Sequence, residues 1–259
     1  MTEPTSTTTW IGTSWKMTKT LAEARAYARV LAGVGWAPRV QPFVIPPATA
    51  IATVAEVLPP DSAVLVGAQD AHWEDEGAWT GEVSVPQVKD AGARLLEIGH
   101  SERRAHFAET DERVNLKVHA ALRHGLLPLV CVGETAQQRA AGAALDTVTA
   151  QVTAALAGVP ATPQVLLAYE PVWAIGEHGT PATPEQVGDV VAAVASVAGP
   201  ARPVLYGGSV SLDNARGLLD LPGVAGLFVG RAAWDVEGFL ALADVAAQPA
   251  PQAPGGPYS

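Results

Sequence analysis

The chain has 259 residues, of which 48% are hydrophobic, and carries a formal net charge of −10. This length and composition allow one large hydrophobic core in a single domain. The acidic balance argues against nucleic acid, which requires a basic face, and no apolar run reaches the roughly 18 residues of a membrane span. A negative net charge is also unfavourable for an anionic substrate. Any phosphate site must therefore be formed locally, by a lysine and backbone N–H groups.

The sequence indicates neither a disulfide framework nor a cofactor. Its one cysteine, Cys131, cannot form an internal disulfide and fits a reducing compartment. The polar, Thr-rich start of the chain lacks the apolar core of a signal peptide, so we expect a cytoplasmic protein. No CxxC pair, histidine cluster, HExxH or P-loop motif is present, so we expect no metal and no cofactor.

Short apolar runs typical of buried strands follow one another along the chain. They cover residues 10–14, 43–45, 64–68, 95–99, 127–132, 165–169, 204–206 and 226–229. Helical patterns separate most of them, from about residue 18 and over about 48–58, 111–124, 136–157 and 183–197, and a polar-aromatic loop covers 69–82. We expect one domain over 10–247, with a flexible tail at 1–9 and a disordered Pro-, Ala- and Gly-rich tail at 248–259.

The apolar runs show no alternation with polar residues, which indicates a parallel sheet covered by helices on both faces. Eight strand–helix units in a chain of this length close more readily into a barrel than into an open sheet. We therefore predict an α/β fold with a single (β/α)₈ barrel. In such a barrel the functional residues lie at the carboxyl ends of the strands.

Polar residues and glycines follow several of the predicted strands. They are Ser14 and Lys16, His100 and Glu102, Glu170, Gly207 to Ser209, and Gly230 with Arg231. A carboxylate base, a histidine and a lysine beside glycine-rich phosphate loops suit the removal of a proton next to a carbonyl. Each residue alone has a simpler explanation as a solvated charge, a core histidine or a turn, but their occurrence together at successive strand ends argues against that explanation for the set.

Five motifs then connect the chain to a known family. They are WKM at 15–17, GHSERR at 99–104, CVGE at 131–134, AYEPVWAIG at 168–176 and YGGSV at 206–210. With these motifs the chain resembles triosephosphate isomerase over roughly residues 10–245. The resemblance implies a TIM barrel that isomerises a sugar phosphate through an enediolate, with Glu170 as the base, His100 as the electrophile and Lys16 as the electrostatic anchor.

The resemblance also implies further roles. Glu102 would support the site, and Gly176, Ser209 and Gly230 would offer backbone donors to the phosphate. Pro171 and Trp173 would begin a hinged lid over the site. In the loop over 69–82, Trp79 and Thr80 would insert into a neighbouring subunit near its Lys16, which predicts a homodimer.

The pattern of the family is broken around the expected ligand. Ser14 stands where the family has a longer Asn, and Arg231 replaces the second glycine of the last phosphate loop. The family's equivalent of Tyr206 bonds a backbone N–H at the position of Pro181, and proline has no N–H, so the usual lid latch cannot form.

With these departures the chain is most similar to the branch that converts L-erythrulose 1-phosphate, a tetrulose phosphate, to D-erythrulose 4-phosphate. The alternative is an ordinary triosephosphate isomerase acting on dihydroxyacetone phosphate and D-glyceraldehyde 3-phosphate. A more remote alternative is a barrel that binds a sugar phosphate without turning it over. A complete set of Lys16, His100 and Glu170 argues against pure binding, because a binding protein needs no base.

Overall fold

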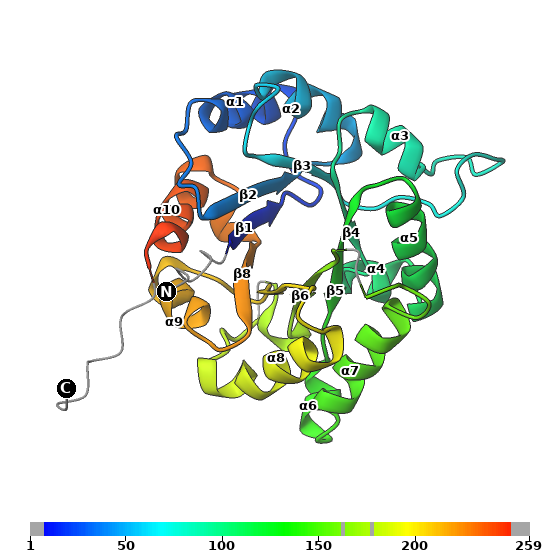
Figure 1. The fold of residues 1–259 in the computed structure, drawn as a ribbon, viewed down its shortest axis with the longest axis vertical. Helices are drawn as coiled ribbons and strands as arrows, with labels where there is room; N and C mark the ends of the chain where they lie inside the picture. Colours follow the sequence, from blue (N-terminus) through cyan, green and yellow to red (C-terminus); the bar gives the residue numbers. More distant parts are fainter. Residues whose placement is uncertain (1–7, 162–163, 177–178, 250–259) are drawn as a thin grey trace, which may run out of the picture.

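The structure is a computed structural model that describes residues 8–161, 164–176 and 179–249. Parallel strands close into one barrel in chain order from β1 to β8, with helices around the outside (Figure 1). The strands are β1 (Thr9–Ser14), β2 (Val40–Ile45), β3 (Leu65–Ala68), β4 (Leu95–Ile98), β5 (Leu127–Val132), β6 (Leu166–Tyr169), β7 (Val204–Tyr206) and β8 (Val224–Val229). The predicted single (β/α)₈ barrel is confirmed.

The predicted helices are present, but one of them is divided in two and four further helices were not predicted. They are α1 (Leu21–Ala32), α2 (Ile51–Val57), α3 (Val85–Asp90), α4 (Ser101–His106), α5 (Asp111–Arg123), α6 (Ala136–Ala140), α7 (Ala144–Ala155), α8 (Pro184–Ala198), α9 (Leu212–Leu219) and α10 (Val236–Ala247). The continuous helix predicted over 136–157 is wrong, because the chain turns at Gly142, where φ is +74°. The helices α3, α4, α9 and α10 were not predicted.

Two apolar cores hold the barrel together. The first packs the outer faces of the strands against the helices. The second fills the barrel interior with side chains that include Trp10, Phe43 and Leu129. Gly12 is required here, because a Cβ at this position would lie 2.1 Å from the Phe43 ring. The packed interior lies directly beneath the residues at the carboxyl ends of the strands and supports them.

The predicted domain boundaries fall close to the ends of the barrel. Thr9 already belongs to β1, one residue before the predicted start, and α10 ends at Ala247. Residues 1–7 and 250–259 of the predicted tails lie outside the described residues. Within the described ranges, no helix is long and apolar enough to cross a membrane.

Candidate active site

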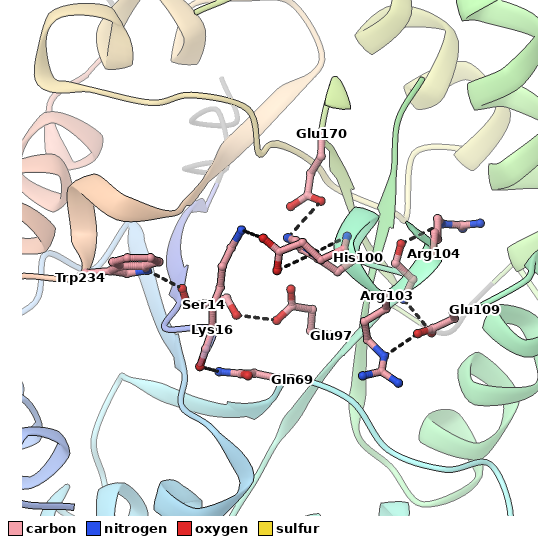
Figure 2. A network of polar contacts seen from close by, with 12 residues as sticks. Ser14, Lys16, Gln69, Glu97, His100, Arg103, Arg104, Glu109, Glu170 and Trp234 are labelled. Atoms are coloured by element: carbon pink, nitrogen blue, oxygen red, sulfur yellow. Dashed lines mark hydrogen bonds and ion pairs between the residues drawn. The ribbon is translucent and has the colours of Figure 1, made fainter. Parts of the chain in front are cut away.

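A cavity of about 400 Å³ lies at the carboxyl ends of the barrel strands, where the sequence places the functional residues. It collects side chains from segments far apart in the sequence (Figure 2). The predicted site residues that line it are Ser14, Lys16, His100, Glu170, Gly176, Ser209, Gly230 and Arg231. Trp234 also lines it and donates its indole N–H to the Ser14 carbonyl at 3.1 Å.

Glu170 follows β6 directly and is buried. Its backbone N–H donates to the Val132 carbonyl at 2.7 Å, which continues the sheet ladder by one residue. Two glycines make room for it: a Cβ at Gly133 would lie 1.9 Å from the Glu170 carbonyl oxygen, and one at Gly207 would lie 2.7 Å from Glu170 Cγ. The carboxyl group is thereby held between β5 and β7 and faces the cavity.

Burial raises the pKa of Glu170 well above its ordinary value, and the nearby Glu97 carboxyl raises it further. The Lys16 ammonium and the Cys131 thiol act in the opposite direction. Among the described residues, Glu170 Oε2 has no hydrogen-bond partner. A buried carboxylate without solvation is a strong base toward a proton presented from the cavity.

His100 is the N-cap residue of α4 and faces Glu170 across the cavity. Its Nδ1 accepts the backbone N–H of Glu102 at 3.1 Å, so the proton of the neutral ring sits on Nε2. Nε2 lies 3.7 Å from Glu170 Oε2. Burial lowers the pKa of His100 to about 4, and the charge of Lys16 contributes to this shift. The ring is therefore a neutral N–H donor at physiological pH.

Lys16 brings the positive charge to the cavity. Its Nζ lies 2.5 Å from Glu102 Oε1, across a gap of 86 residues in the sequence. Its backbone has φ of +53°, an unusual conformation for a residue with a side chain. The Gln69 side-chain amide holds this strained segment by donating to the Lys16 carbonyl at 2.9 Å.

A polar network outside the barrel fixes the segment that carries His100. Gly99, with φ of +77°, donates its N–H to Glu109 at 3.1 Å and accepts from Arg104 at 2.8 Å. Arg103 pairs with Glu109 at 2.6 Å and with Asp70 at 2.7 Å, and the buried Lys117 pairs with the same two carboxylates. These contacts explain why arginines follow the histidine in the GHSERR motif.

The glycine-rich segments after β7 and β8 form the opposite wall. Gly207, Gly208, Gly230 and Arg231 line the cavity together with Ser209. The Ser209 hydroxyl donates to the Ala174 carbonyl, which ties this wall to the segment after Glu170. Arg231 is exposed and lines the same cavity.

The start of the predicted lid is anchored by a buried acid. Glu134 accepts the Trp173 indole N–H at 2.7 Å and the Tyr169 hydroxyl at about 3.1 Å. Arg139 stacks over the Trp173 ring, with 4.5 Å between the guanidinium carbon and the ring centroid. Pro171 joins Glu170 to a short 3₁₀ turn over Val172–Ala174. CVGE was recognised as a motif in the sequence, but this role of its glutamate was not predicted.

Tyr206, the residue expected to have lost its usual contact with the lid, lies at the end of β7. Among the described residues, the buried Tyr206 hydroxyl has no hydrogen-bond partner. It lies against Gly208, where a Cβ would come within 2.3 Å of the hydroxyl oxygen. Pro181 is exposed, and Glu177 and His178 of the lid lie outside the described residues.

The loop after β3 extends away from the barrel before α3 begins (Figure 1). In this loop Trp79 packs against His72, with ring centroids 4.3 Å apart and ring planes tilted by 33°, and Thr80 is exposed. Elsewhere on the surface, a second cavity of about 220 Å³ shares Ser14, Lys16 and His100 with the first and is also lined by Met17 and Phe107. The side chains of Met17, Phe107 and Trp79 are 98%, 61% and 49% exposed, which leaves large apolar groups in water.

Trp234 was not predicted as a site residue, and neither was the buried acid Glu97. Glu97 interrupts the apolar run of β4, is buried, and accepts the Ser14 hydroxyl at 2.8 Å (Figure 2). A charged residue inside an apolar strand was a signal that could have identified it. The described residues contain no group of three or more His, Cys, Asp or Glu side chains that could hold a metal ion.

Comparison with known proteins agrees with this geometry. A sequence model described as triosephosphate isomerase matches residues 9–246. The chain is 54% identical over 244 residues to L-erythrulose-1-phosphate isomerase of Mycolicibacterium smegmatis, covering 92% of this chain and 93% of the relative. It is 51% identical to the protein of the same name from Rhizobium rhizogenes, covering 89% and 92%, and 54% identical to that from Rhizobium etli, covering 89% and 90%. The chain therefore belongs to the triosephosphate isomerase family.

Proposed function

We propose that this protein is a ketose-phosphate isomerase that converts L-erythrulose 1-phosphate to D-erythrulose 4-phosphate. The observation that carries the chemistry is the pairing of a buried Glu170 carboxyl with His100 Nε2 at 3.7 Å in a cavity that also holds Lys16. One group can remove a proton from carbon, and the other two can stabilise negative charge on oxygen. No cofactor is needed for such a transfer.

In the proposed reaction, Glu170 takes the proton from C3 of L-erythrulose 1-phosphate. The electron pair of the broken C–H bond forms an enediolate over C2 and C3. His100 donates its Nε2–H to the oxygen that becomes negative, and the Lys16 ammonium stabilises the same charge. Glu170 then returns its proton to C2, and the hydroxyl proton moves from the C3 oxygen to the C2 oxygen, so the carbonyl ends on C3 with all atoms conserved.

The other residues serve binding in this proposal. Backbone N–H groups of Gly176, Ser209 and Gly230 hold the phosphate, and Arg231 adds a charged, forked donor. Glu102 keeps Lys16 directed into the cavity. Pro171 and Trp173 begin the lid segment that excludes water during the reaction, and Tyr206, at the end of β7, belongs to the wall of the site beside it.

We propose the four-carbon substrate because relatives that are 50–54% identical to this chain are named L-erythrulose-1-phosphate isomerase. Their similarity covers about nine tenths of the chain. The residues lining the cavity support it, because Ser14 is short and Arg231 supplies donors that a glycine would lack. An ordinary triosephosphate isomerase remains the second candidate, on the strength of the family alone. The perturbed pKa values of Glu170 and His100 favour turnover over passive binding.

We also propose that the protein works in the cytoplasm as a homodimer. The loop tip with Trp79 and Thr80 and the cavity lined by Met17 and Phe107 are two exposed apolar features of one chain. In a dimer each could cover the other, with the loop of one subunit closing the cavity beside Lys16 of its partner. This arrangement would remove both apolar surfaces from water.

Replacing the proposed base tests the mechanism. We expect Glu170→Gln to lower kcat by about 10²–10⁴-fold or more, because the amide cannot accept the proton from carbon. The affinity for 2-phosphoglycolate, measured by calorimetry, should stay within a few-fold of the wild-type value. Glu185→Gln, which removes an exposed carboxylate from α8, is the matched control and should leave kcat unchanged. A Glu170→Gln variant with wild-type kcat would remove this residue from the mechanism.

Substrate preference tests the assignment. We expect the wild-type protein to have a higher kcat/KM for L-erythrulose 1-phosphate than for dihydroxyacetone phosphate in the same buffer. The double variant Ser14→Asn, Arg231→Gly should shift the ratio toward the triose phosphate, because it narrows the cavity and removes the added donors. If the wild-type protein prefers dihydroxyacetone phosphate by tenfold or more, the chain is an ordinary triosephosphate isomerase with unusual loops.

Replacing Trp79 and Thr80 with Gly and Ser tests the dimer. The variant should dissociate at higher protein concentration than the wild type in sedimentation velocity, and its activity should fall together with the dimer fraction. Leu145→Ser, which removes another exposed apolar side chain on α7, should affect neither property. Finding that the wild-type protein is an active monomer at micromolar concentration would show that the loop does not serve this purpose.

A further inference from the structure

Glu97 is a buried acid that the proposed proton transfer does not use. It sits on β4 with its side chain on the inner face of the barrel, as Leu95 does two residues earlier. Leu96 and Ile98, at the alternate positions, pack in the outer core. Only 2% of Glu97 is exposed, and within the described part of the chain the Ser14 hydroxyl is its one hydrogen-bond partner.

Apolar side chains fill the surrounding interior positions, such as Phe43, Leu95 and Leu129. A carboxyl group at this depth is costly unless its polar atoms have partners. Burial raises the pKa of Glu97 to about 8, against the opposing effects of the Ser14 hydrogen bond and the Lys16 charge. At neutral pH the group is therefore mostly an uncharged acid, which offers both an O–H donor and an acceptor.

Glu97 lies on the side of the barrel opposite the segments that we propose to hold the phosphate. In a closed barrel of eight strands in chain order, β3 and β4 lie opposite β7 and β8. The glycine-rich segments proposed to hold the phosphate follow β7 and β8, and the reacting carbons must lie within reach of both Glu170 and His100, which line the same cavity. With the phosphate held there, the other end of the substrate would point toward β4.

The two candidate substrates differ at that end. In dihydroxyacetone phosphate the carbon that loses its proton carries only hydrogen and a hydroxyl group, whereas in L-erythrulose 1-phosphate it also carries a hydroxymethyl group. Ser14 is short enough to leave room beside this carbon. Glu97 lines the smaller cavity, which shares Ser14, Lys16 and His100 with the main one, so its carboxyl group adjoins the same space (Figure 2).

We propose that Glu97, together with Ser14, is the specificity-determining pair that binds the terminal hydroxyl of a four-carbon ketose phosphate. The substrate hydroxyl donates to one oxygen of the Glu97–Ser14 pair and accepts a hydrogen bond from another oxygen of the pair. The buried carboxyl group of Glu97 thereby gains a second hydrogen-bond partner. A three-carbon substrate has no group at this position and leaves the acid without that partner. This inference rests on the proposed function, because it explains how the site prefers four carbons.

The test compares Glu97→Leu and Glu97→Gln with the wild-type protein on L-erythrulose 1-phosphate and dihydroxyacetone phosphate. For Glu97→Leu we expect kcat/KM to fall by about 100-fold or more on the four-carbon substrate and to change by less than about fivefold on the three-carbon one. Glu97→Gln keeps the shape and part of the hydrogen bonding, so its loss on the four-carbon substrate should be smaller, at about tenfold.

Leu95→Val is the matched control, because it alters the same inner face of β4 without changing a polar group. It should leave the ratio of the two kcat/KM values unchanged. The Kd for 2-phosphoglycolate, which has no hydroxymethyl group, should be the same in the wild type and in both Glu97 variants and shows that the site is intact.

Three results would overturn the inference. The first is an equal loss on both substrates, which would make Glu97 a general requirement of the site. The second is no loss on either substrate. The third is a failure of both Glu97 variants to bind 2-phosphoglycolate, which would make the acid a structural element. A wild-type protein active only on the triose phosphate would overturn the proposed function as well, whereas an unchanged ratio in the variants would overturn this inference alone.

Discussion

The exclusion of water from the ionisable groups of the cavity is the constraint on which the rest of the site depends. Glu170, His100 and Glu97 are all buried, and desolvation is the largest cause of the pKa shift of each. It makes the histidine a neutral donor and strengthens the basicity of the Glu170 carboxylate. Lys16, which pairs with Glu102 and is more exposed, places its positive charge close to the buried groups.

The barrel supplies the rigidity that such a site requires. Buried groups with raised or lowered pKa values must be held against the tendency to turn toward water. Glycines without a Cβ let β5 and β7 close around Glu170, and the carboxylates of Asp70 and Glu109 fix the arginine of the segment that carries His100. Glu134 fixes the start of the lid by accepting the indole N–H of Trp173. The site is therefore supported by residues that do not line it.

Sequence reasoning identified the fold and the polar residues at the strand ends that line the cavity, because both depend on local patterns. Apolar runs indicate strands, and residues at strand ends meet at one face of a barrel. Sequence reasoning missed the roles of residues whose contact partners lie far away in the sequence. The contact of Glu134 with Trp173 spans 39 residues, and Glu97 meets Ser14 across 83. The break at Gly142 was missed because its flanking alanines favour a helix on both sides.

The protonation state of His100 tests the account most directly, because it follows from desolvation and not from any assumed substrate. ¹⁵N NMR of the labelled protein between pH 5 and 8, with His100→Gln to assign the signals, reports both ring nitrogens. With a pKa of about 4, the ring should remain neutral throughout, with its proton on Nε2. Signals of a charged imidazolium appearing near pH 6.5, the ordinary value for histidine, would contradict the account.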